Sequence, residues 1–173
     1  MGSNTVTAGA IYCDMTVVKT VGDSVAMQVQ TTPGTPFTIT ARIASGLPAT
    51  GQKSITGLVL RNSTSGRLYT VGSYLSNSGA YALVSTWGGP TSINSNPFNN
   101  PYGLIQYFRL VVTATTVSAY VSVDGSAWQL LDTTTIASYL TATGGSMDQV
   151  GWFADDTLAT DGHALLYWFR RTA

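Results

Sequence analysis

Carboxylates are the first side chains to consider as catalysts in this chain. All eight acidic residues are aspartate, because the sequence contains no glutamate. Hydrolysis of a glycosidic bond needs two carboxyl groups that flank the bond to be cleaved. Asp155 and Asp156 are adjacent, so on an extended backbone they point to opposite sides. His163, the single histidine, would have to serve any nucleophile–His–Asp relay, and it is interpreted as a surface residue at a strand end. The sequence therefore predicts no catalytic residue and no enzyme activity.

The same acidic stretch offers oxygen ligands for a metal ion. Asp155, Asp156 and Asp161 belong to a segment interpreted as an acidic loop, and calcium prefers oxygen ligands. The segment lacks the ordered Asp/Asn/Gly spacing of a recognised calcium loop, so a solvated turn is the competing interpretation. Cys13, the one cysteine, can form no internal disulfide and no zinc site with other cysteines. No cofactor is expected, with Ca²⁺ as the open alternative.

Residues 88–103 form the strongest candidate for recognition. The segment has no hydrophobic periodicity and contains three prolines and four asparagines, which predicts a long loop. Asparagine amides suit sugar hydroxyls, and aromatic rings stack on the apolar face of a pyranose. The candidate glycan contacts in and beside this segment are Trp87, Asn94, Asn96, Phe98, Asn99, Asn100 and Tyr102. The alternatives are a hairpin loop whose Phe98 folds back as a lid, and a loop that packs on a neighbouring subunit.

Two further candidates for glycan contact lie on predicted strands. Tyr120 shares a face with Ser118 and Ser122, opposite the apolar side of its strand. If this face is the concave one, Tyr120 and Arg109 would line a groove. The remaining tryptophans are given structural roles: Trp152 and Trp168 are expected in the core, and Trp128 is expected to pack onto the sheet.

Short strands separated by turns must position these residues. Residues 116–123 alternate apolar and polar side chains with a period of two, and Asp124-Gly125 then reverses the chain into a return strand. Alternating or apolar runs predict further strands near residues 25–30, 37–43, 55–61, 67–74, 81–87, 104–113, 149–154 and 163–171. This spacing predicts an all-β antiparallel sandwich of about ten to twelve strands in a single domain over residues 1–173. Residues 1–24 are expected to form an N-terminal arm or short edge strands.

The amino-acid composition limits the kinds of partner that the chain is expected to bind. Charged residues make up 9% of the chain and the formal net charge is zero, which argues against electrostatically driven binding to nucleic acid or to an anionic membrane. Ser and Thr account for 43 of 173 residues, which favours strands, turns and a polar, uncharged surface. No apolar run is long enough to span a membrane, and no signal peptide is expected at the N-terminus.

The order of the strand motifs resembles a known superfamily. The motifs are GLVLR (57–61), LYTVGSY (68–74), YALVSTW (81–87), FRLVV (108–112), AYVSVDGSAW (119–128), QVGWFA (149–154) and ALLYWFR (164–170). Within the fifth motif, Ser122, Asp124, Gly125 and Trp128 match an S-x-D-G-x-x-W pattern. The series is similar to the concanavalin A-like lectin/glucanase superfamily, including its laminin-G-like domains. The resemblance implies a jelly-roll sandwich, but it does not fix an activity, because the superfamily includes lectins, glycosidases, adhesion modules and phage appendages.

A non-enzymatic phage or virion domain is the function expected from these features. It would serve in a fibre, a spike or a capsid decoration, at the virion surface or outside the cell, and bind surface glycans or other virion proteins. A homo-oligomer is expected, because such appendages are usually symmetric. The alternatives are a carbohydrate-binding module of a secreted bacterial protein and, third, a glycoside hydrolase that uses aspartate.

Overall fold

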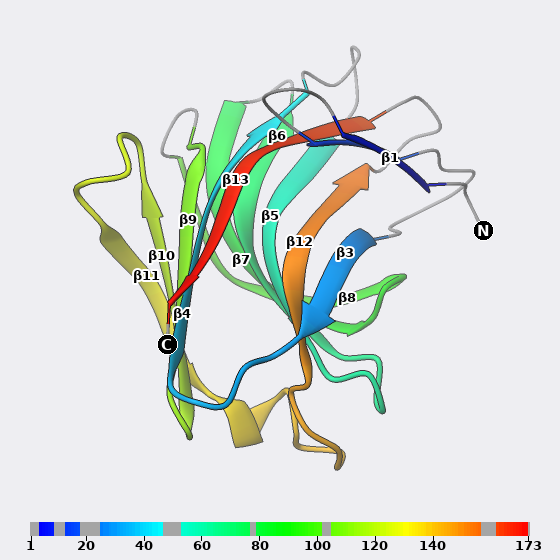
Figure 1. The fold of residues 1–173 in the computed structure, drawn as a ribbon, viewed down its shortest axis with the longest axis vertical. Coiled ribbons are helices and arrows are strands. Elements are labelled where there is room, and N and C mark those ends of the chain that lie inside the picture. Colours follow the sequence, from blue (N-terminus) through cyan, green and yellow to red (C-terminus); the bar gives the residue numbers. More distant parts are fainter. Residues whose placement is uncertain are drawn as a thin grey trace.

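A computed structural model shows the fold of residues 4–8, 13–17, 25–46, 53–76, 79–101, 105–156 and 162–172 (Figure 1). These residues form thirteen strands and one short 3-10 helix. The strands are β1 (Asn4–Ala8), β2 (Cys13–Val17), β3 (Ala26–Thr31), β4 (Phe37–Ser45), β5 (Lys53–Arg61), β6 (Leu68–Ser76), β7 (Gly79–Gly89), β8 (Ser92–Pro101), β9 (Tyr107–Val112), β10 (Thr116–Ser122), β11 (Gln129–Thr135), β12 (Gln149–Asp156) and β13 (Gly162–Thr172), with the helix η1 at Ile136–Ser138. No helix in the described ranges is long and apolar enough to cross a membrane.

Two antiparallel sheets make up the sandwich. The seven-stranded sheet has the order β1-β2-β13-β4-β9-β10-β11, and the six-stranded sheet has the order β3-β12-β5-β6-β7-β8. Figure 1 shows the seven-stranded sheet arching over the six-stranded one. The predicted fold class, an all-β antiparallel sandwich, is confirmed. Near the N-terminus, β1 is the edge strand of the larger sheet and pairs with β2, which in turn pairs with β13.

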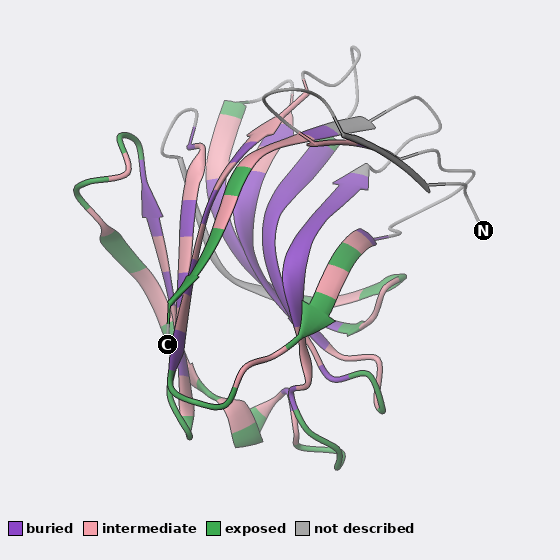
Figure 2. Cartoon of the chain, in the orientation of Figure 1, coloured by how far each residue is buried: buried purple, intermediate pink, exposed green. Residues whose placement is uncertain are grey.

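The main core lies between the two sheets, where strand alternation directs apolar side chains inward. In β4 the side chains alternate regularly between buried and half-buried, so Phe37, Ile39, Ala41 and Ile43 face the core. β9 alternates in the same way, and β10 does so as far as Val121, after which Ser122 is also buried; Figure 2 colours the strands by burial. The other faces of these strands carry polar and aromatic side chains toward solvent.

The outer face of the six-stranded sheet holds a second apolar cluster. Residues 54–60 of β5 are all buried, with Leu58 in the main core and its neighbour Val59 in the second cluster. This cluster consists of Val25, Ile55, Val59, Leu68, Leu83, Trp87 and Phe153. Because adjacent strand residues point to opposite faces, the sheet is buried on both sides.

Curvature helps to close this second face. The amide of Val25, before the edge strand β3, donates to the carbonyl of Pro90, in the turn between β7 and the opposite edge strand β8, at 2.7 Å.

Gly57 and Gly72 face each other across β5 and β6, and a Cβ on Gly57 would lie 2.0 Å from the Val71 carbonyl oxygen. The two strands therefore approach each other more closely than a larger residue allows, and glycine is required at this point.

The turn between β10 and β11 is organised by Asp124. Its Oδ1 accepts the amides of Ser126 (2.8 Å) and Ala127 (3.0 Å), and Gly125 adopts a φ of 79°. These bonds hold the pKa of the Asp124 carboxyl well below its ordinary value, with the Ser126 amide as the largest cause. The prediction that Asp124 shapes a turn in a hairpin is confirmed.

The prediction of a long loop at residues 88–103 is wrong, because most of this segment forms the strand β8. A tight turn at Pro90 and Thr91 connects β7 to β8, and the two strands pair with three register shifts. The sequence gives no strand signal because β8 is an edge strand, where proline and irregular pairing are tolerated. The prediction that Asp155 and Asp156 lie in an acidic loop is also wrong, since they are the last two residues of β12.

Candidate arginine–tryptophan groove on the seven-stranded sheet

Strand pairing brings chemically rich side chains together on the outer face of the seven-stranded sheet. One row across the sheet consists of Arg170, Thr40, Arg109 and Tyr120, from β13, β4, β9 and β10 in that order. A neighbouring row consists of Trp168, Arg42 and Tyr107. The residues beside Thr40 and Arg109 in sequence, Ile39 and Leu110, are fully buried in the core. Both rows therefore face away from the core.

A β-bulge in β13 places two aromatic residues on this face. Leu166 pairs with Ile43 and Trp168 pairs with Arg42, so Tyr167 is one extra residue between two consecutive partners on β4. Tyr167 lies against the guanidinium of Arg42 at 4.5 Å from its ring centroid, on the outer face, and Trp168 is 40% exposed. The expectation that Trp168 is in the core is therefore wrong, because a bulge redirects side chains.

The guanidinium of Arg109 lies over an aromatic ring. Its guanidinium carbon lies 3.8 Å from the ring centroid of Trp128, which follows the β10–β11 turn. Its Nε also donates to Thr40 Oγ1 at 3.4 Å. Burial lowers the pKa of the Arg109 guanidinium, and its interaction with Tyr120 opposes this shift. The group keeps its positive charge, because arginine is not deprotonated in proteins.

A groove of about 420 Å³ lies between these side chains. It is lined by Thr38, Thr40, Arg109, Gly125, Trp128, Trp168, Arg170 and Thr172. The lining combines two indole rings, three hydroxyl groups and two guanidinium groups, and includes no described carboxylate. We refer to it as the arginine–tryptophan groove. Aromatic platforms with hydroxyl and guanidinium groups beside them suit the stacking and hydrogen bonding of a sugar ring.

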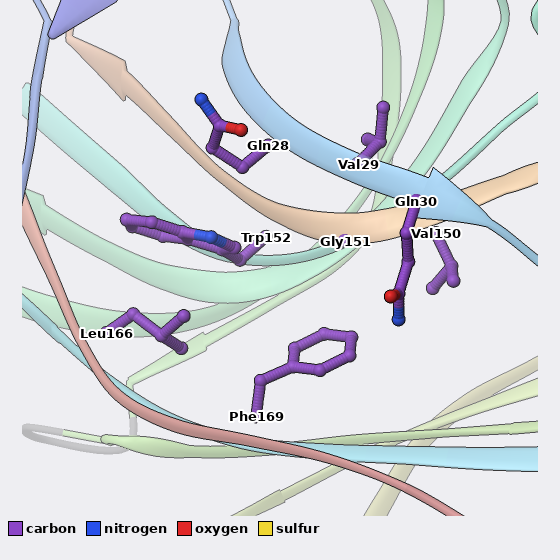
Figure 3. A pocket seen from close by; sticks show the side chains of 8 residues that line it. All are labelled: Gln28, Val29, Gln30, Val150, Gly151, Trp152, Leu166 and Phe169. Atoms are coloured by element: carbon purple, nitrogen blue, oxygen red, sulfur yellow. The ribbon is translucent and has the colours of Figure 1, made fainter. Parts of the chain in front are cut away.

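A second pocket, of about 250 Å³, opens at the edge of the sandwich. Its lining includes Gln28 and Gln30 of β3, Trp152 of β12, and Leu166 and Phe169 of β13, and Figure 3 shows Gln30 pointing toward Phe169. The two glutamine side chains are exposed, whereas Trp152 is 5% exposed and belongs to the main core, as its sequence predicts. We refer to it as the edge pocket. Its walls are mainly apolar, and the polar groups on its lining side chains are the two glutamine amides and the indole N–H of Trp152.

The residues predicted in and beside the expected loop do not assemble into a described site. Trp87 is fully buried in the second cluster, and its Nε1 donates to Thr70 Oγ1 at 3.1 Å. Its ring cannot stack on a sugar there, so this prediction is wrong. Both faces of this sheet are covered, and local sequence patterns do not show this. Asn94 is exposed and donates from Nδ2 to the Tyr139 hydroxyl at 3.1 Å. Asn96, Phe98, Asn99 and Asn100 belong to β8, with side chains outside the described part, and Tyr102 lies outside the described residues.

The structure brings together the two candidates predicted on strands. Arg109 and Tyr120 are paired across β9 and β10 on the outer face, but only Arg109 lines the groove. Sequence reasoning missed Trp128, Trp168 and Arg170 as their companions. The signal for Arg170 was its alternation with Phe169, but the register of β13 against β4 cannot be obtained from sequence patterns.

The three aspartates proposed as metal ligands are not gathered in a described site. Asp155 is fully buried in β12, and Asp156 is paired with Ser54 in the same sheet. Asp161 lies outside the described residues. Within the ranges that the structure covers, no group of three or more His, Cys, Asp or Glu side chains could hold a metal ion.

Comparison with known proteins supports the fold. No family model matches the chain, and no curated protein matches it in sequence. Among solved structures, a GH43 protein of Bacillus licheniformis superposes with a TM-score of 0.72 at 18% identity, over 94% of this chain and 33% of that one. The chain thus spans about a third of the length of that protein.

Two smaller proteins match over most of their own length. A carbohydrate-binding module, CBM66 of Bacillus subtilis, has a TM-score of 0.57 at 10% identity, over 100% of this chain and 94% of that one. A legume lectin-like domain of Entamoeba histolytica has a TM-score of 0.56 at 8% identity, with coverages of 99% and 88%. At these identities the likeness establishes the fold, a jelly-roll sandwich of the lectin-like kind.

Proposed function

We propose that this chain is a non-catalytic carbohydrate-binding domain of the concanavalin A-like kind, and that the arginine–tryptophan groove is its binding site. The observation that carries the proposal is the position of Trp168. Its indole is 40% exposed on a polar sheet face, beside the guanidinium of Arg170 and a row of threonine hydroxyls. An exposed indole next to hydrogen-bond donors is the arrangement that binds the apolar face and the hydroxyls of a sugar together.

Several side chains of the groove are anchored in the middle of the sheet. Thr38, Thr40 and Arg109 stand on central strands of the sheet, and Arg109 is fixed by its stacking on Trp128. A side chain that is already ordered loses little conformational entropy when it binds a ligand. The solved structures that share this fold include a carbohydrate-binding module and a lectin-like domain, which supports the proposal.

The proposal that the domain does not catalyse rests on its acidic residues. The chain has no glutamate, and no described aspartate lines the groove. Asp124, which adjoins the groove-lining Gly125, accepts hydrogen bonds within its own turn. Incubation with a panel of polysaccharides should release no reducing ends. Turnover that disappears when Asp155 and Asp156 are both changed to Asn would establish an enzyme instead.

Binding is tested by screening the purified chain on a glycan array and then measuring the best ligand by calorimetry. Trp168→Ala is expected to weaken binding at least tenfold, about 1.4 kcal/mol. Leu130→Ala is the matched control, since Leu130 is 50% exposed on β11 of the same sheet and does not line the groove. Unchanged binding by the Trp168 variant, or no ligand on the array, overturns the assignment.

The edge pocket is the competing location for a sugar. A double variant, Gln28→Ala with Gln30→Ala, removes both amides from its rim. This variant is expected to bind as the unmodified chain does. Loss of binding in this variant, together with full binding by Trp168→Ala, would move the site to the edge pocket.

The setting of the domain is a further part of the proposal. The composition, with 9% charged residues and many Ser and Thr, supports an outward-facing role on a virion or phage appendage as a symmetric homo-oligomer. Mass spectrometry of purified particles and light scattering of the isolated chain test these two points. The chain is expected among the particle proteins and at a multiple of 18.2 kDa in solution.

A module of a larger secreted bacterial protein is the alternative setting. The observation in its favour is the partial coverage of the GH43 protein, of which this chain matches about a third. Sequencing the genes around the coding region separates the two settings: tail and capsid genes support the virion, and glycosidase genes support the secreted protein.

A further inference from the structure

We infer that the glycan bound in the arginine–tryptophan groove is acidic, with a carboxylate on its sugar units that is held by Arg109 and Arg170. This inference rests on the proposed function and adds the chemical class of the ligand. It follows from the positions of the arginine side chains and from the hydrogen bonds that each guanidinium group makes within the fold.

The two guanidinium groups are placed to bind one extended ligand. Arg170 of β13 and Arg109 of β9 both pair with Thr40 of the strand between them, β4. Because neighbouring strands are about 4.8 Å apart, the backbones at the two arginines are roughly 10 Å apart. Thr40 and the exposed ring of Trp168 lie beside this span. A ligand that crosses the groove meets a cation on each side and an aromatic platform beside them.

Other arginines of the chain use their guanidinium groups within the fold. Arg42 donates twice to Gln106 Oε1, Arg61 donates to Gln149 Oε1, and Arg67 donates to the carbonyl of Tyr139. Arg109 differs, because among the described residues its hydrogen bond runs only from Nε to Thr40. No described residue accepts a hydrogen bond from its two terminal nitrogens. Arginine is well suited to a planar carboxylate, which it can bind with two parallel N–H donors.

The local charge of the groove contrasts with the chain as a whole. The chain has a formal net charge of zero, yet the groove lining contains two arginines and no described acidic side chain. The nearest acidic group in sequence to a lining residue is Asp124, whose oxygens accept bonds from Ser122, Ser126 and Ala127. A neutral sugar would leave both cations without a partner of opposite charge. A carboxylate-bearing sugar pairs with them in a site that is already partly desolvated.

The test uses glycans that differ only in their charge. Oligogalacturonate and its fully methyl-esterified form have the same sugar rings, and only the first has carboxylates. The acidic form is expected to bind at least tenfold more tightly, measured by calorimetry or by tryptophan fluorescence. Its affinity is expected to fall as salt rises from 50 to 500 mM, since exposed charges are screened over about a Debye length.

Arginine variants then locate the effect. Arg170→Gln is expected to weaken binding of the acidic form about fivefold or more and to leave binding of the ester unchanged. Arg171→Gln is the matched control, because it removes the same charge one residue away and does not line the groove. Its affinity is expected to stay within twofold of the unmodified chain. Circular dichroism confirms that both variants are folded.

The outcomes separate this inference from the proposed function. Equal, salt-independent binding of the two forms, or selective binding of neutral or sulfated glycans on an array, overturns the carboxylate assignment and leaves a carbohydrate-binding domain. Equal losses in the Arg170 and Arg171 variants also overturn it, since they indicate a general charge effect. Absence of binding to every acidic and neutral glycan overturns both proposals.

Discussion

The buried hydroxyl of Tyr69 links the two sheets of this sandwich. Tyr69 of β6 is fully buried, and its hydroxyl donates to Asp132 Oδ2 of β11 at 2.7 Å. Burial raises the pKa of Tyr69 well above its ordinary value, and the bond to the Asp132 carboxylate adds to this shift. The phenol therefore stays protonated in the folded protein and acts as a donor to a charged group. Such a bond stabilises more than one between neutral groups.

Removal of this hydroxyl should be measurable. Tyr69→Phe is expected to lower the free energy of unfolding by about 2 kcal/mol, because the half-buried Asp132 loses its donor. Tyr74→Phe, on the same strand but facing the second cluster, is the control and should change stability by less than about 0.5 kcal/mol. Urea unfolding of both variants gives the comparison. A double-mutant cycle with Asp132→Ala isolates the pair, and an interaction energy near zero would show that the bond contributes nothing.

Three residues show which structural features can be predicted from neighbouring residues in the sequence and which cannot. Asp124-Gly125 was predicted as a turn and is one, because the local bonds of an aspartate in a turn need only the next few residues. Trp87 and Trp168 exchanged their expected roles, since Trp87 is buried and Trp168 is exposed. Their environments are set by a second covered sheet face and by a bulge, and both features depend on distant strands.

At the scale of elements, the bulge in β13 decides which side chains reach the groove. Tyr167 is the extra residue, so Leu166 and Phe169 both face the core while Trp168 and Arg170 both face outward. Deletion of Tyr167 leaves a regular alternation with the same faces. We expect this variant to fold, with a loss of about 1 kcal/mol from the missing contact between Tyr167 and Arg42.

The control deletion is placed in a regular strand. Ala41 lies in β4, which pairs with β9 without a register shift. Its removal turns the side chains on one side of the deletion to the wrong face, so this variant is expected not to fold. Thermal unfolding followed by circular dichroism distinguishes the two. If the Tyr167 deletion also fails to fold, the residue is not a dispensable insertion and the account of the bulge is wrong.

For the whole molecule, the sequence predicts the fold class more readily than the site. Period-two alternation needs only neighbouring residues, and it located β4, β9 and β10 and hence the sandwich. The groove depends on register among Thr40, Arg109 and Arg170, which are far apart in the chain. Local patterns give strands but not their neighbours or offsets. The strand β8 escaped prediction for a related reason, since its formation depends on pairing with β7 and not on its own propensity.

The two sheets share one main core, which leads to a prediction about how the molecule unfolds. Leu58 of the six-stranded sheet and Leu110 of the seven-stranded sheet are both fully buried in it. Since each sheet covers the inner face of the other, neither should remain folded alone. We expect a single unfolding transition whose calorimetric and van't Hoff enthalpies agree. Leu58→Ala and Leu110→Ala should each lower the stability of that same transition by about 3 kcal/mol. Two resolved transitions, each shifted by only one of the variants, would show that the sheets unfold as separate units.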